Sequence, residues 1–212
     1  MLALSANAQY KKPVMLNDPE YDVGKRLRFG FSIGINTMDF TTKNSGKDSI
    51  FADVSHLIPG FNVNAVVDYR LSEYFHLRFL PGYAFGQRNM NFFSKKDTMI
   101  QVESSFIDLP VSIKYSAERV TNARPYLLFG GNYRIDLATS KKSNDQIFRL
   151  AKGDIYYEIG FGYDFFMQYF KFSVELKYSV GVLNVLSKGT GKYVQAIDKL
   201  NSQLFIVAFH FE

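Results

Sequence analysis

The sequence predicts an all-β fold, an eight-stranded, antiparallel, up-and-down transmembrane β-barrel over residues 28–212. Three observations predict it. Apolar and polar residues alternate with period two in repeated stretches, the connections between these stretches are long and short in turn, and aromatic residues gather at one level. The alternating stretches are residues 28–40, 59–71, 75–87, 104–117, 125–139, 153–166, 170–184 and 201–212.

The stretch "GDIYYEIGFGYDFF", residues 153–166, shows the alternation most clearly. From Ile155 onward every second residue is apolar or aromatic, whereas Glu158 and Asp164 lie on the opposite face. Across all eight stretches the apolar face carries no Asp, Glu, Lys or Arg. The stretches also exceed the five or six residues of ordinary strands and suit tilted membrane strands of about 9–11 residues or more. We therefore expect the apolar face to meet lipid.

The connections give the expected sidedness. The short ones are "SEY", "ERVTNAR" and "MQY", and they alternate with connections of more than about a dozen residues. Outer-membrane barrels have short periplasmic turns and longer extracellular loops. An even number of strands then places both termini in the periplasm.

Aromatic residues on the apolar face lie at the end that bears the short turns. Such a girdle is typical of a membrane interface, where aromatic rings sit at the level of the lipid headgroups. The residues are Phe29, Tyr69, Phe75, Tyr115, Phe165, Phe170 and Phe211.

Acidic and basic residues occupy the opposite face in nearly equal numbers. An eight-stranded barrel is just wide enough to be filled by its own side chains, so we expect a structural network of paired charges in the lumen. Its predicted members are Asp68, Arg70, Arg78, Asp108, Lys114, Arg134, Asp136, Glu158, Asp164, Lys171, Glu175 and Lys177. Glu158 and Asp164 are about 20 Å apart along one strand, which is too far for a catalytic pair.

The composition argues against enzymatic, metal and nucleic-acid functions. The chain has no cysteine and three scattered histidines, so no metal-ligand spacing is present. The motif "KGTGK" at residues 188–192 lacks the flanking residues of a phosphate-binding loop. The net charge of +5 is mild and dispersed. We expect no cofactor, no catalytic residues and no nucleic-acid partner.

The first residues indicate export. The run "MLALSANA" ends in Ala6-Asn7-Ala8, the small-x-small pattern that a signal peptidase prefers, so we interpret residues 1–8 as a signal-peptide remnant. Residues 9–27 are expected to form a periplasmic N-terminal segment, extended because of Pro13 and Pro19. This segment either docks a partner or is slack.

One long connection is particularly basic. Its Lys141, Lys142, Arg149 and Lys152 suit contact with lipopolysaccharide or an acidic partner, and equally suit an ordinary solvated loop. A soluble eight-stranded barrel around a lipophilic ligand would show the same alternation. The order of the connections, the aromatic level and the terminal "FHFE" favour the outer membrane instead.

Several segments resemble the PorT family of Bacteroidota outer-membrane proteins, which is linked to type IX secretion and, in gliding species, to motility. They are "FIDLPVSIKY" (106–115), "RPYLLFGGNYRIDL" (124–137), residues 153–166, "FKFSVELKYSVGVLNVL" (170–186) and the closing "IDKLNSQLFIVAFHFE". The resemblance implies a non-enzymatic outer-membrane barrel that serves as an accessory or assembly component of type IX protein secretion. The alternative is an independent surface barrel that contacts lipopolysaccharide or extracellular ligands.

Overall fold

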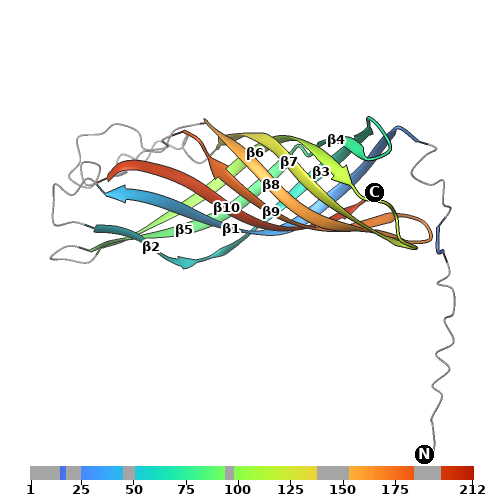
Figure 1. The fold of residues 1–212 in the computed structure, drawn as a ribbon. Coiled ribbons are helices and arrows are strands. Elements are labelled where there is room, and N and C mark those ends of the chain that lie inside the picture. The colour runs from blue at the N-terminus through green and yellow to red at the C-terminus, as the bar shows by residue number, and fades with distance from the viewer. Residues whose placement is uncertain (1–14, 18–24, 45–50, 94–97, 138–152, 184–196) are drawn as a thin grey trace, which may run out of the picture.

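A computed structural model describes residues 15–17, 25–44, 51–93, 98–137, 153–183 and 197–212. The chain forms one closed antiparallel β-barrel, which confirms the predicted fold class (Figure 1). Among the described residues, no helix is long and apolar enough to cross a membrane. The strands are β1 (Leu27–Asn44), β2 (Phe51–Leu57), β3 (Pro59–Arg70), β4 (Phe75–Phe79), β5 (Gly82–Phe93), β6 (Thr98–Ser116), β7 (Ala123–Asp136), β8 (Gly153–Phe166), β9 (Lys171–Gly181) and β10 (Ile197–Phe211).

The ten labelled strands form the eight strands of the barrel wall, which we call staves. Two of the staves consist of two labelled strands each, because a proline interrupts them. Ile58 separates β2 from β3, which begins at Pro59, and Leu80-Pro81 separates β4 from β5. Proline has no N–H to donate to the ladder. The barrel stays closed across the second interruption, because the Leu80 N–H donates to the Pro110 carbonyl at 3.1 Å and the Pro81 carbonyl accepts from the Ala65 N–H at 2.9 Å.

The staves follow one another around the barrel in chain order, and pairing of β1 with both β10 and β3 closes it. A walk along paired residues starts at Leu27 in β1 and returns to β1 at Thr37, ten residues further along. With a rise of about 3.3 Å per residue and about 4.8 Å between strands, this stagger tilts the strands by about 40° from the barrel axis. The residues on the walk between them are Tyr69, Leu77, Ile113, Phe129, Ile159, Tyr178 and Phe205.

Wherever the structure describes the side chains of a strand, they alternate between the outside and the lumen. In β8 the outward residues are exposed or half-buried and the inward ones, including Glu158 and Asp164, are buried. Outward aromatic rings at the short-turn end contact one another across strands. Phe31 and Phe211 have centroids 4.9 Å apart, and those of Phe75 and Tyr115 are 5.2 Å apart. Every stave therefore contributes residues to the predicted lipid-facing surface.

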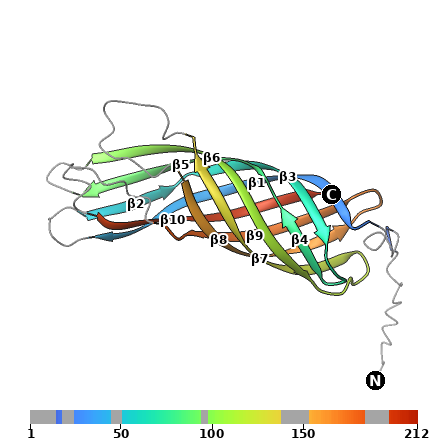
Figure 2. The same ribbon diagram turned by 90° about the horizontal axis from the view of Figure 1, so that it is seen from above.

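Three of the four long connections differ from the prediction, because part of each of them belongs to a strand. β1 runs to Asn44, β5 to Phe93, β6 starts at Thr98 and β10 at Ile197. Figure 2 shows these strands reaching well beyond β7, β8 and β9. The reason is that hairpin ladders continue past the apolar band, for example with Asn89 opposite Gln101, since backbone pairing does not require an apolar face.

The short connections lie at the opposite end. They join β3 to β4, β6 to β7 and β8 to β9, and the C-terminus lies at this same end (Figure 1). Residues 15–17 also lie here, beside the β6–β7 and β8–β9 turns, in both views. We refer to this end of the barrel as the short-turn end.

Candidate functional site

The polar side chains of the barrel meet in the lumen. Near the short-turn end they are arranged around Arg78 of β4. The Arg78 guanidinium is fully buried and lies between three carboxylates. Its Nη2 is 3.0 Å from Asp68 Oδ2 and 2.7 Å from Glu212 Oε1, and its Nη1 is 3.4 Å from Glu175 Oε2. These carboxylates come from β3, β9 and the residue that follows β10. One cation therefore links strands on several sides of the lumen.

Further groups surround these three carboxylates. The His76 ring lies 2.7 Å from Asp68 through Nδ1, and Lys171 Nζ is 2.8 Å from Glu212 Oε2. The Tyr126 hydroxyl donates to Glu175 Oε2 at 2.9 Å, and His210 Nε2 lies 3.4 Å from the same oxygen. We call this set, together with Arg78 and its carboxylates, the ionic level of the lumen.

Asp164 of β8 adds a second group of contacts to the ionic level. Both of its oxygens accept from Lys114 Nζ at 2.8 Å, Oδ2 accepts from Arg124 at 3.1 Å, and Oδ1 accepts from the Ser173 hydroxyl at 2.7 Å. The Lys114 ammonium also lies 3.8 Å from the centre of the Tyr126 ring. Hydrogen bonds from several donors compensate for the removal of this carboxylate from water.

Two more carboxylates are held further along the barrel. Glu158 accepts from Asn132 at 3.1 Å and from the Ser179 hydroxyl at 2.9 Å, and Lys177 Nζ lies 3.0 Å away. Arg134 donates to both oxygens of Asp108, with 2.6 Å between Nη2 and Oδ2.

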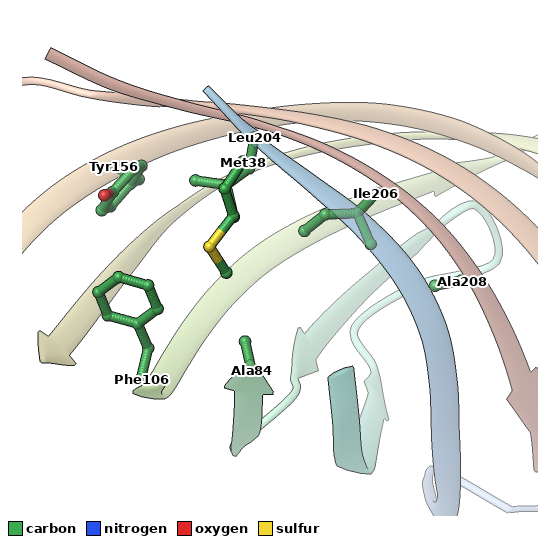
Figure 3. Packing of buried hydrophobic residues seen from close by; sticks show 7 residues of the cluster. All are labelled: Met38, Ala84, Phe106, Tyr156, Leu204, Ile206 and Ala208. Carbon is green, nitrogen blue, oxygen red and sulfur yellow. The ribbon is translucent and has the colours of Figure 1, made fainter. Parts of the chain in front are cut away.

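The lumen also contains an apolar cluster, which the sequence reading did not anticipate. We call it the apolar level. It lies further from the short-turn end, because Met38 lies beyond the middle of β1 and pairs with Leu204 of β10. The Arg134 guanidinium borders it, 5.0 Å from the Phe106 ring centre and 4.7 Å from that of Tyr156. Its members are Met38, Ala84, Phe106, Tyr156, Leu204, Ile206 and Ala208 (Figure 3).

Eleven of the twelve predicted lumen residues are buried. The exception is Arg70, which lies half-buried at the mouth, where its Nε donates to the Ser72 carbonyl at 3.1 Å. Asp136 is buried near the far end of β7. The basic loop residues Lys141, Lys142, Arg149 and Lys152 lie outside the described residues, as does the "KGTGK" connection.

The alternation also places His76 and Ser173 on the lumen face, but sequence reasoning missed four other residues of the ionic level. Arg124 directly precedes a predicted stretch and Glu212 ends one, while Tyr126 and His210 lie within stretches but are not among the charged residues expected in the lumen. Period-two counting from Phe211 would have placed Glu212 and His210 inside. Counting from Leu127 would have placed Tyr126 and Arg124 there too.

The arrangement offers charge pairing rather than reactive groups. Among the residues with described side chains, the buried His76 and His210 lie against carboxylates. Within the described ranges no group of His, Asp and Glu is arranged to hold a metal ion.

Comparison with known proteins places the chain among outer-membrane barrels. A family model described as "Outer membrane protein beta-barrel domain" matches residues 7–187, and no curated protein matches the chain. Among solved structures, the outer membrane protein OprG from Pseudomonas aeruginosa is 14% identical, with 87% of this chain and 92% of OprG covered and a TM-score of 0.49. Neisserial surface protein A is 11% identical, with 88% and 98% covered and a TM-score of 0.46. Ail, the attachment invasion locus protein of Yersinia pestis, is 14% identical, with 86% and 96% covered and a TM-score of 0.38.

The family match covers most of the chain and agrees with the closed antiparallel barrel, its lipid-facing apolar surface and its charged lumen. The chain belongs to the family of outer membrane protein β-barrel domains and is an eight-stranded barrel of the bacterial outer membrane.

Proposed function

We propose that this barrel is a non-enzymatic, non-conducting component of the outer membrane that supports type IX protein secretion, as an accessory or assembly factor. In this proposal the short-turn end faces the periplasm. Residues 1–8 are a signal-peptide remnant, residues 9–27 are a periplasmic segment, and residues 28–212 are the barrel. The lumen charges hold the staves together and perform no chemistry.

The filled lumen is the observation that carries the proposal. Arg78, Lys114 and Asp164 are fully buried at the ionic level, and Met38 and Leu204 are 1% exposed at the apolar level. A solute crossing the barrel would have to displace paired charges and then packed apolar side chains, both of which are costly. A barrel with such an interior is suited to act through its outer surface, its turns and its termini.

The choice of pathway is supported by the resemblance to the PorT family. The segments that carry it include β8 and residues 170–186, and β8 supplies Glu158 and Asp164 to the lumen. The proposed partners are outer-membrane lipids, lipopolysaccharide and other components of the secretion machinery. In gliding bacteria the same role would extend to motility.

A second candidate is an independent surface barrel that contacts lipopolysaccharide or extracellular ligands. The basic residues Lys141, Lys142, Arg149 and Lys152 favour it, because four cations in one connection suit an anionic surface.

Deletion of the gene separates the two candidates. We expect cargo of the type IX pathway to accumulate inside the cell, while other outer-membrane proteins and the permeability barrier remain normal, and a plasmid copy to restore export. Normal cargo export in the deletion strain would overturn the secretion role. Loss of lipopolysaccharide-dependent barrier function in that strain would support the second candidate.

A further inference from the structure

We propose that the β6–β7 and β8–β9 turns form a peptide-docking site at the short-turn end, and that the chain's own Leu16 and Asn17 occupy it. This site goes beyond the proposed secretion role and does not depend on it. The N-terminal segment is then bound to the barrel at a defined place instead of being a slack leader.

The docked residues are held by backbone and side-chain groups together. The Leu16 N–H donates to Asn122 Oδ1 at 2.9 Å, and the Asn17 carbonyl accepts from Arg119 Nη2 at 3.3 Å. The Asn17 side-chain amide donates to the Met167 carbonyl at 2.9 Å. Asn17 is only 8% exposed, whereas its neighbour Leu16 is 52% exposed. Three hydrogen bonds and one buried amide are more than an incidental surface contact provides.

The barrel supplies this site with fixed groups. The Arg119 guanidinium lies 4.0 Å from the centre of the buried Phe166 ring, and its Nε donates to the Thr121 carbonyl at 2.8 Å. Asn122 is fixed as well, because its carbonyl accepts from the Phe166 N–H at 2.8 Å. Thr121 adopts a φ of 58°, which is uncommon for a residue other than glycine. Arg119 and Asn122 are thus oriented by contacts within the turns, which lowers the entropy cost of binding a peptide.

The topology places the docked residues far from the start of β1, which follows them in the sequence. The ends of β7 and β8, where the two turns lie, are four and three staves from β1 around the barrel. Asn17 and Leu27 therefore lie on opposite sides of the short-turn end. The spacing and tilt of the strands give a barrel diameter of about 16 Å, and ten residues reach about 33 Å, so the chain readily spans this distance.

The chemistry of the site defines what it binds. It binds the backbone N–H of the first residue, and the backbone carbonyl and the side-chain carboxamide of the second. This is the pattern of a bent peptide with asparagine in the second position. A binding partner of the N-terminal segment must either recognise the docked form or displace Leu16 and Asn17 from the turns.

Distance measurements on the full-length protein test this site. Because the chain has no native cysteine, spin labels can be placed at Met15→Cys, beside the docked pair, and at Tyr169→Cys, on the exposed tip of the β8–β9 turn. We expect one short, narrow distance distribution by pulsed electron paramagnetic resonance. The short-distance peak should be lost in Asn17→Ala and Asn122→Ala backgrounds, whose barrels should keep the heat-modifiable gel mobility of the parent.

Three results would overturn the proposal. One is a broad distribution in the doubly labelled parent. Another is a narrow distribution that survives both alanine substitutions. The third is a short-distance peak that disappears on dilution with unlabelled protein, which would assign the docked segment to a second copy of the chain. None of these results would bear on cargo export, so the outcome is separate from that of the deletion experiment.

Discussion

The ionic and apolar levels of the lumen are held together in different ways. At the ionic level Arg78 contacts Asp68, Glu175 and Glu212, so the loss of one group leaves several others unbalanced. At the apolar level Met38 fills space among residues such as Tyr156 and Leu204. The stability of the ionic level thus depends on the identity of each residue, whereas the stability of the apolar level depends on the volume and shape of its side chains.

The largest expected effect is at the ionic level. Arg78→Met keeps much of the side-chain volume but leaves three buried carboxylates without their common cation. Removal of one partner of a buried ion pair costs about 3–5 kcal/mol, so we expect a loss of this size in the free energy of unfolding. Urea titration of the protein folded into lipid vesicles, read by gel mobility, measures it.

Arg26→Met is the matched control, because the Arg26 side chain is exposed at the same end and surface substitutions change stability by within about 0.5 kcal/mol. If Arg78→Met unfolds at the same urea concentration as Arg26→Met, the ionic level does not stabilise the barrel in the way described.

The next effect is at the apolar level. Met38→Ala should leave a cavity in the lumen and cost about 2–5 kcal/mol, whereas Met38→Leu should cost less than about 1.5 kcal/mol because it nearly conserves volume. The same urea titration compares them. Equal losses for the two variants would show that residue identity matters here too, and the contrast between the levels would fail.

The contrast between the levels also explains what could be predicted from the sequence. In β8 the two faces meet different surroundings, lipid outside and paired charges inside, so the alternation around Glu158 and Asp164 is plain and the prediction of buried inward residues followed from it. In β10 both faces are apolar, since Leu204 and Ile206 point inward while Phe205 and Val207 point outward. Alternation carries no signal where lumen and lipid have the same polarity, so the apolar level was missed.

The pairing of the charges could not be read from the sequence either. Arg78 and Glu212 are 134 residues apart, and they meet only because of the strand register and the ten-residue stagger of the barrel. The docking of Asn17 beside Met167, 150 residues away, depends on turn conformation in the same way. Local patterns predict which face a residue takes, but contacts across the lumen depend on closure of the whole barrel.

The smallest expected effect is at Gly162 of β8, a glycine of the barrel wall that packs against Tyr126 of the ionic level. Gly162 faces the lumen, and a methyl group there would clash with the Val174 carbonyl oxygen and lie 2.6 Å from Cζ and from the hydroxyl of Tyr126. A methyl group at Gly131, on the outer face of β7, would come no closer than 3.6 Å to the Tyr156 carbonyl oxygen. Overpacking costs about 1–3 kcal/mol. In the urea titration, Gly162→Ala should therefore lower the free energy of unfolding by about that much, and Gly131→Ala should lower it little.

Displacing Tyr126 also disturbs its hydrogen bond to Glu175 and its contact with Lys114. Tyr126→Phe should therefore reduce part of the cost of Gly162→Ala, since it removes the contact with the hydroxyl and leaves the contact with the Val174 carbonyl. If the two substitutions are additive within about 0.5 kcal/mol, the glycine acts on the wall alone and the link to the ionic level is wrong.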